Sequence, residues 1–296
     1  MTAPESAQPS EAPQPPRAPA SPGPFGARLR RALDDRGPLC VGVDPHAALL
    51  AAWGLDDDVA GLERFARTVV DALADRVAVL KPQSAFFERF GSRGIAVLER
   101  AIADARSAGA LVLTDAKRGD IGSTMAAYAA AYLDPGSPLF SDAVTVSPYL
   151  GFGSLRPALD AARAAGSGVF VLALTSNPEG AEVQRATAGD GASVAQTVLD
   201  HIARENAGAR PLGPVGAVVG ATLGETGADL AVNGPLLAPG LGAQGATAAD
   251  LPRVFGDAVR NVVPSISRGV LGRGPSPRAL REAAAREADA LREVLG

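Results

Sequence analysis

Ten residues near the middle of the chain carry side chains suited to acid–base and electrostatic chemistry. Asp115 and Lys117 come directly after a short apolar run, and Asp120 and Thr124 follow. Residues two apart on a strand point to the same side, so we expect Asp115 and Lys117 to leave a strand end as a pair. Asp120 then lies in a glycine-containing turn, and Thr124 lies one helical turn above it if a helix begins near Ile121. The ordinary alternative is a solvated loop, where charged side chains are common.

The choice between lysine and arginine along the chain indicates that the two lysines have a functional role rather than serving as general surface charge. The chain has two lysines, Lys81 and Lys117, although Lys and Arg together number 28. Arginine therefore supplies the general surface charge. An ammonium is a compact charge that can release a proton, which a guanidinium does not do. Both lysines follow apolar runs, at residues 77–80 and 111–114, so we treat both as candidate functional residues.

The first 24 residues differ in composition from the rest of the 296-residue chain. They are rich in Pro, Ala and Ser and lack apolar periodicity. Such a segment buries too little apolar surface to offset the entropy of ordering it. We predict a disordered tail over residues 1–24 and one catalytic domain over residues 25–296. The tail lacks the apolar core of a secretion signal, and we expect its deletion to change neither fold nor rate.

Composition also excludes several functional classes. No run approaches the roughly 18 apolar residues of a membrane span. A net charge of −4 argues against a nucleic-acid surface. One cysteine, Cys40, excludes an internal disulfide and fits a cytoplasmic protein. His46 and His201 are too few for a histidine-based metal site, and we expect no metal.

From residue 25 onward, short apolar runs alternate with helical patterns. The expected strands are residues 39–43, 77–80, 111–114, 143–146, 169–174, 215–219, 236–238 and 262–266. The expected helices are residues 27–35, 62–74, 85–88, 95–108, 125–133, 155–165, 193–205, 224–231 and 277–295. Eight strands, each followed by a helical stretch, predict an α/β protein with a single (β/α)8 TIM barrel. An open doubly wound sheet usually has fewer strands and a glycine-rich loop after the first, where this chain has Asp44-Pro45-His46.

Polar residues follow most of the expected strands, at the end of a barrel where active sites form. These residues are Asp44, Lys81, Asp115 with Lys117, Ser147, Ser176 with Asn177, Gln244 and Arg268. A barrel built only for stability does not need so many ionic residues there. The glycine-rich residues 239–245 offer backbone N–H groups to a phosphate, and Arg268 offers a planar fork. A glycine loop that merely turns is the commoner case, so the glycines alone are a weak signal.

The motifs at these strand ends resemble the orotidine 5′-phosphate decarboxylase family, in its longer bacterial (type 2) branch. They are VDP at 43–45, LKPQSAFFE at 80–88, DAKRGDIGST at 115–124, SPYLG at 147–151, TSNP at 175–178, PGLGAQG at 239–245 and SRG at 267–269. The resemblance covers every barrel section except the sixth. Its most specific motif surrounds Lys117.

The resemblance implies decarboxylation of orotidine monophosphate to uridine monophosphate without metal or cofactor, in de novo pyrimidine synthesis. The implied catalytic array is Lys81, Asp115, Lys117 and Asp120, which would stabilise and protonate a carbanion at C6 of the pyrimidine. A homodimer is implied as well. In it, Asp120 reaches the site of the neighbouring subunit.

The resemblance also assigns substrate contacts. Ile121 and Thr124 would cross the dimer interface together with Asp120. Asp44, Lys81 and Thr124 would hold ribose hydroxyls. Ser176 would bond to the pyrimidine edge, and Gln244 and Arg268 would hold the phosphate.

Three alternative functions stay open at this stage. A magnesium-dependent keto-sugar-phosphate decarboxylase of the same superfamily shares the D-x-K-x-x-D pattern, but it has an acidic residue where this chain has Lys81, whose charge would repel the ion. A non-catalytic barrel that binds a phosphate ligand would show binding without turnover. A Schiff-base aldolase using Lys117 needs a neutral amine, whereas the two neighbouring carboxylates favour the charged form.

Overall fold

Eight parallel strands form a closed barrel in the part of the chain that the structure describes. This computed structural model describes residues 23–189, 191–242 and 245–296. Each strand pairs with the next along the chain, and β1 pairs with β8. The strands are β1 (Cys40–Val43), β2 (Val79–Pro82), β3 (Leu111–Arg118), β4 (Ala143–Val146), β5 (Gly168–Leu174), β6 (Val215–Val219), β7 (Leu236–Pro239) and β8 (Val262–Ile266). The predicted (β/α)8 barrel is confirmed. Residues 1–22 of the predicted tail lie outside the described residues.

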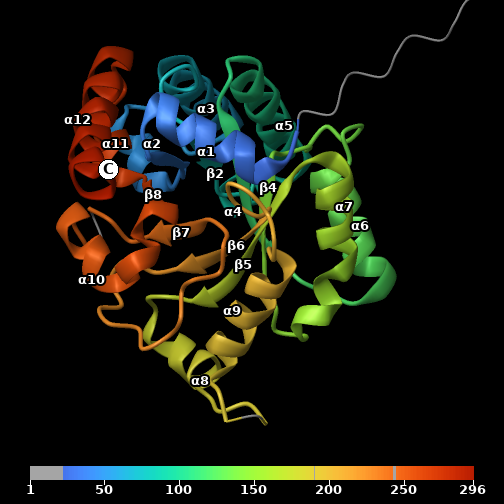
Figure 1. The fold of residues 1–296 in the computed structure, drawn as a ribbon. Coiled ribbons are helices and arrows are strands. Elements are labelled where there is room, and N and C mark those ends of the chain that lie inside the picture. The colour runs from blue at the N-terminus through green and yellow to red at the C-terminus, as the bar shows by residue number, and fades with distance from the viewer. Residues whose placement is uncertain (1–22, 190, 243–244) are drawn as a thin grey trace, which may run out of the picture.

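Helices surround the strands (Figure 1). Buried apolar side chains of the helices pack with those of the strands in one core cluster. The α-helices are α1 (Phe25–Arg36), α2 (Ala47–Ala52), α3 (Val59–Leu73), α4 (Ala85–Glu88), α5 (Gly91–Ser107), α6 (Gly122–Leu133), α7 (Arg156–Ala165), α8 (Ala181–Gln184), α9 (Val194–Glu205), α10 (Leu251–Phe255), α11 (Arg268–Leu271) and α12 (Pro277–Leu295). Short 3-10 turns are η1 (Phe152–Leu155), η2 (Pro178–Gly180), η3 (Ala248–Asp250) and η4 (Gly256–Asn261). The last helix, α12, packs beside α3 and closes the ring.

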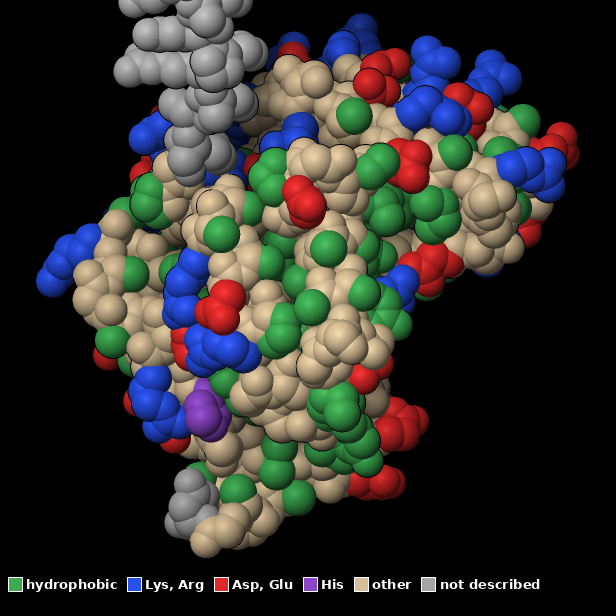
Figure 2. Space-filling view, turned by 90° about the vertical axis from the view of Figure 1, so that its right-hand side faces the viewer, with side chains coloured by type: hydrophobic (Ala, Val, Ile, Leu, Met, Phe, Trp, Pro, Cys, Tyr) green, Lys and Arg blue, Asp and Glu red, His purple; other side chains and the backbone are tan. Residues whose placement is uncertain are grey.

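The outer surface carries charges of both signs. On the face that Figure 2 shows, acidic and basic side chains often lie side by side. None of the described helices has both the length and the apolar character needed to cross a membrane.

Inward-pointing side chains, two residues apart along each strand, form two layers inside the barrel. Val79, Leu113 and Phe170 belong to an apolar layer near the amino ends of the strands. Two residues further along β2 and β3 come Lys81 and Asp115, which point the same way because strand side chains alternate with a period of two. The carboxyl end of the barrel interior is therefore polar, and its floor is apolar.

Helix α1 closes the amino end of the barrel. Its first residue, Phe25, is 3% exposed and meets Phe170 edge to face, with ring centroids 6.1 Å apart. Arg28 bonds to the buried Asp142 at 2.6 Å and to the carbonyl of Gly166 at 2.9 Å. Only the carboxyl end of the barrel is left to admit a ligand.

The prediction of a helix over residues 224–231 is wrong, so β6 is not followed by a helix. The structure has irregular backbone there, with one bend at Ala228. Gly224 and Gly227 both have φ of +68°, in the left-handed region that a helix does not use. The backbone N–H of Ala231 donates to the side chain of Asp229 at 2.9 Å. Such local bonds compete with helix formation.

Two strands, β2 and β3, end two or more residues later than the sequence indicated. β2 includes Lys81, and β3 includes both Asp115 and Lys117, whereas we expected these residues just beyond the strands. The prediction ended each strand with its apolar run, but the interior layer near the carboxyl end is polar. Helix α6 begins at Gly122, three residues before the expected start at Met125, so the condition that a helix begins near Ile121 is met.

Candidate active site

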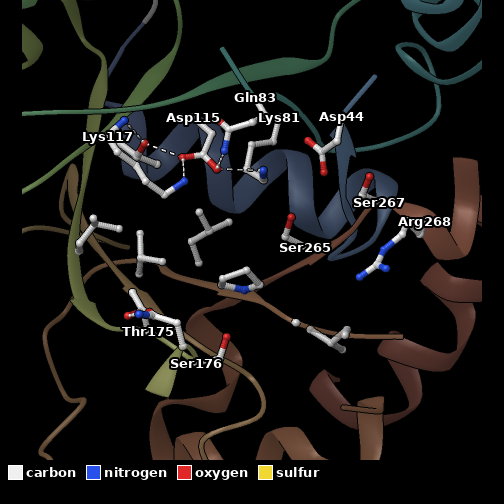
Figure 3. Close-up of a pocket in the computed structure, with 18 of the residues that line it drawn as sticks. Asp44, Lys81, Gln83, Asp115, Lys117, Thr175, Ser176, Ser265, Ser267 and Arg268 are labelled. Atoms are coloured by element: carbon white, nitrogen blue, oxygen red, sulfur yellow. Dashed lines mark hydrogen bonds and ion pairs between the residues drawn. The ribbon is translucent and has the colours of Figure 1, made fainter. Parts of the chain in front are cut away.

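The carboxyl ends of the strands surround a cavity of about 510 Å³. Six of the predicted site residues line it: Asp44, Lys81, Asp115, Lys117, Ser176 and Arg268. Figure 3 shows the lysines and Asp115 grouped at one end and Arg268 at the other. The site can thus hold an elongated molecule with an anionic group at one end and a reacting group at the other.

Asp115 is at the centre of the polar end. It is buried, and four donors surround its carboxylate. Oδ1 accepts from Lys117 Nζ at 2.6 Å and from Thr145 Oγ1 at 2.8 Å. Oδ2 accepts from Lys81 Nζ at 3.2 Å and from Gln83 Nε2 at 3.1 Å. This carboxylate therefore has one orientation, which fixes both ammonium groups around it.

The electrostatics of this cluster keep Asp115 and Lys81 charged. Burial by itself raises the pKa of Asp115, but the positive charges of Lys81 and Lys117 hold that pKa well below its ordinary value. Burial by itself lowers the pKa of Lys81, but the negative charges of Asp115 and Asp44 raise that pKa above its ordinary value. The cavity thus presents fixed charges at neutral pH.

Lys81 and Lys117 differ in their access to the cavity. The side chain of Lys81 is 7% exposed, whereas that of Lys117 is 44% exposed. Lys117 also points into the cavity (Figure 3). Lys117 is therefore the ammonium that can approach a ligand and exchange protons with it.

Asp44 and Ser267 lie together beside the lysine cluster. Within the described residues, Asp44 Oδ1 and Ser267 Oγ are buried and have no hydrogen-bond partner. A Cβ on Gly42 would come within 3.0 Å of both side chains, so the glycine permits their close approach. Unpaired buried oxygens are costly, and ligand hydroxyls would satisfy both.

Arg268 and the segment after β7 form the other end of the cavity. Gly240 and Leu241 line the cavity there, next to Arg268. A guanidinium beside backbone N–H groups suits a phosphate. Gln244, which we predicted as a second phosphate contact, lies outside the described residues, so its role stays a prediction.

Three predicted residues do not line the cavity of this chain. Asp120 accepts a hydrogen bond from the N–H of Ile121 at 2.8 Å, and Ile121 is 62% exposed. Thr124 is also exposed. A single chain therefore brings none of the three to its own cavity.

Sequence reasoning missed several cavity residues, among them Gln83, Thr145 and Ser265. Gln83 follows Lys81 by two positions, so the period of a strand could have placed it on the same side. Thr145 and Ser265 stand inside apolar runs. A polar residue within a buried strand is the signal that would have found both.

No metal-binding group is found within residues 23–189, 191–242 and 245–296: no cluster of three or more His, Cys, Asp or Glu side chains is placed to hold an ion.

Fold and site together define a (β/α)8-barrel enzyme that acts on a small anionic molecule. Within this class, the chain belongs to the Orotidine 5′-phosphate decarboxylase / HUMPS family, whose model matches residues 37–283.

Individual relatives agree with this assignment. The orotidine 5′-phosphate decarboxylase of Streptomyces coelicolor is 73% identical over 273 residues, which cover 92% of this chain and 98% of that protein. The Corynebacterium glutamicum enzyme is 51% identical over 267 residues, 89% of this chain and 96% of that protein. A crystal structure of the putative enzyme from Streptomyces avermitilis superposes with a TM-score of 0.92 at 71% identity, covering 93% of this chain and 97% of that one.

Proposed function

We propose that this protein decarboxylates orotidine 5′-phosphate to uridine 5′-phosphate and carbon dioxide, as a step of pyrimidine biosynthesis. Beyond the family assignment, one observation carries the proposal. The cavity holds the Lys81–Asp115–Lys117 cluster at one end and Arg268 at the other. That spacing of charges fits a nucleotide whose reacting ring lies far from its phosphate.

The chemistry requires a positive charge at the reacting carbon. When the bond from C6 to the carboxylate breaks, its electron pair stays on C6 and carbon dioxide leaves. The pyrimidine ring delocalises this pair poorly, so a fixed ammonium nearby lowers the barrier. The proton then moves from Lys117 Nζ to C6, and Lys117 recovers a proton from solvent. One proton is consumed for each carbon dioxide released.

Asp115 prepares Lys117 for this role. Its carboxylate accepts from Lys117 Nζ at 2.6 Å and stays ionised because its pKa is lowered. The ion pair with Asp115 holds the Lys117 ammonium at the cavity, where it can act as the acid. The same pairing argues against a Schiff-base aldolase, which requires a neutral amine.

The remaining cavity residues fit the other parts of the nucleotide. Asp44 has an unpaired buried oxygen, and it stands near Lys81 in a position suited to ribose hydroxyls. Ser176 would bond to the pyrimidine edge, and Arg268 would pair with the phosphate. Binding of a phosphate far from C6 supplies energy for positioning the ring.

The proposal includes a homodimer in which Asp120, Ile121 and Thr124 complete the site of the partner subunit. None of the three serves the cavity of its own chain. Large apolar side chains are exposed beside them. Ile121, Tyr149 and Leu150 are 62%, 78% and 52% exposed. Exposed apolar side chains that gather on neighbouring loops are typical of a protein interface.

The two loops that carry these side chains are joined. The N–H of Ser147 donates to the carbonyl of Arg118 at 2.8 Å, which ties the start of the segment after β4 to the last residue of β3. We also propose a cytoplasmic location, because the single cysteine, Cys40, fits a reducing compartment.

An absorbance assay with purified protein and orotidine 5′-phosphate tests the proposal. We expect loss of the substrate absorbance, with the same rate after treatment with a chelator. A rate that the chelator abolishes and magnesium restores would favour the metal-dependent decarboxylase. A flat trace combined with tight binding of uridine 5′-phosphate would favour a non-catalytic barrel.

A further inference from the structure

Strand β3 is distorted where it carries the reacting residues. Thr114 pairs with Val144 of β4, and the next pair is Arg118 with Val146. Between these two pairs, residues 115–117 of β3 face one residue of β4, Thr145. Extra residues on one strand form a bulge, which re-aims side chains and leaves backbone groups without their usual partners on the neighbouring strand.

The bulge places Lys117 in an unusual backbone conformation. Its φ is +48°, in the left-handed region that residues with long side chains rarely adopt. A conformation of this kind costs free energy and persists only where surrounding contacts hold it in place. Something in the neighbourhood must therefore hold the backbone of Lys117.

Thr145 provides that contact. The backbone N–H of Lys117 donates to Thr145 Oγ1 at 2.9 Å. The same hydroxyl donates to Asp115 Oδ1 at 2.8 Å. A hydroxyl can accept and donate at once, so one small side chain satisfies both the bulged backbone and the buried carboxylate. Thr145 is 1% exposed, so water does not readily replace it.

We propose that Thr145 is a positioning residue for decarboxylation. Its hydroxyl holds the Lys117 backbone in the bulge and fixes one oxygen of Asp115, so that the ammonium is held where the carbanion forms. This inference rests on the proposed function. Without the hydroxyl, the backbone N–H of Lys117 loses its acceptor, and the bulge relaxes to a conformation with negative φ. The ammonium then moves away from the reacting carbon.

The test replaces Thr145 by valine, which keeps the shape of the side chain and removes the hydroxyl. We expect Thr145→Val to lower kcat about 100-fold, the effect typical of a misplacement by about 1 Å. KM and the affinity for uridine 5′-phosphate should stay near the wild-type values, because ribose and phosphate contacts are unchanged. Thr145→Ser keeps the hydroxyl and should recover most of the lost kcat.

Thr114→Val is the matched control. Thr114, on β3, is buried like Thr145 on β4. Its hydroxyl bonds to Ser141 Oγ at 2.7 Å, outside the cavity. The same substitution there removes a buried hydroxyl from the same strand pair and should leave kcat unchanged. If Thr145→Val does not fold, Thr145→Ala removes the hydroxyl without adding volume and gives the same comparison.

Three results would overturn the inference: an unchanged kcat in Thr145→Val, a loss no larger than in Thr114→Val, or a Thr145→Ser variant as slow as Thr145→Val. A crystal structure of Thr145→Val gives a readout that does not depend on turnover. We expect a negative φ at Lys117 and a longer distance from Lys117 Nζ to Asp115. An unchanged φ would sink the inference, whereas a wild-type protein without decarboxylase activity would sink the proposed function instead.

Discussion

Lys117 combines two properties that a general surface lysine does not need together. It points into the cavity, and its ammonium bonds to the ionised Asp115 at 2.6 Å. In the proposed mechanism, electrostatic stabilisation and proton donation both depend on this one group, so its loss would remove two contributions to the rate.

We therefore expect Lys117→Ala to lower kcat by about 10⁴-fold or more. Affinity for uridine 5′-phosphate, measured by calorimetry, should survive because the phosphate and ribose contacts are intact. Arg93→Ala, which removes an exposed basic side chain on α5, is the control and should behave as wild type. A Lys117→Ala variant that retains turnover would contradict the proposed role.

Asp115 should also contribute to stability in a pH-dependent way. Its pKa in the folded protein lies below the ordinary value of about 3.9, so its contribution is present above that pH and is lost as pH falls toward the folded-state value. The pKa of Lys81 is raised, so its contribution is present below about pH 10 and is lost only at higher pH. Between about pH 5 and 9 the pair should stabilise the fold by a constant amount.

Asp115→Asn should lower the free energy of unfolding by about 3–5 kcal/mol at pH 7, because it leaves Lys81 buried beside a neutral amide. Urea denaturation at several pH values checks this. The difference between variant and wild type should stay constant from about pH 5 to 9 and shrink below about pH 4. If the difference in unfolding free energy grew as pH fell, the pKa of Asp115 in the folded protein would be raised rather than lowered.

At the scale of elements, α1 fits the barrel because β5 begins with a glycine. A Cβ on Gly168 would come within 2.3 Å of the Phe25 ring, which is too close for any rotamer change to relieve cheaply. The position of α1 at the amino end of the barrel therefore depends on residue 168 being a glycine.

We expect Gly168→Ala to destabilise the protein by about 1–3 kcal/mol through overpacking. In a Phe25→Leu background the same change should cost less, because the smaller side chain makes room. Urea denaturation of the four proteins in this double-mutant cycle measures the coupling. Equal costs of Gly168→Ala in both backgrounds would mean that the contact with Phe25 does not constrain α1. Turnover should change little, since α1 lies at the end of the barrel opposite the cavity.

At the scale of the whole molecule, one chain leaves Asp120, Ile121 and Thr124 outside its own cavity. A two-fold dimer would bring each set to the partner, because a symmetric interface places the same residues at both sites. We therefore expect the proposed dimer to be required for activity.

Mixing two inactive variants tests this shared site. In a hybrid of Lys117→Ala and Asp120→Ala subunits, one site receives both defects and the other receives neither. Equal amounts allowed to exchange freely should recover about one quarter of wild-type activity, because about half of the dimers are hybrids with one intact site. Lys117→Ala mixed with Asp115→Ala is the control and should recover nothing, since both residues belong to one chain's cavity. Equal recovery in both mixtures, or none in either, would contradict the shared site.

The barrel and much of its site could be predicted because their signals are local. Apolar runs and helical spacing report on neighbours along the chain, and a polar residue after an apolar run marks the carboxyl end of the barrel interior. Residues such as Asp44, Lys81 and Arg268 are found in this way. The helix expected at 224–231 failed because side chains such as Asp229 bond to the nearby backbone, and this competes with a helix that the spacing favours.

By itself, the sequence determined the order of the strands and of most helices, and the end of the barrel where the site lies. It also identified Lys81 and Lys117 as candidate functional residues in an arginine-rich chain. Only the tertiary structure decided that Asp115 joins both lysines, and that Thr145 supports the bulge that carries Lys117. These contacts link β2, β3 and β4, which lie about 30 residues apart along the chain. The periodicity of one strand does not determine which side chains of the neighbouring strand will face it. Contacts between strands therefore cannot be deduced until the barrel has closed.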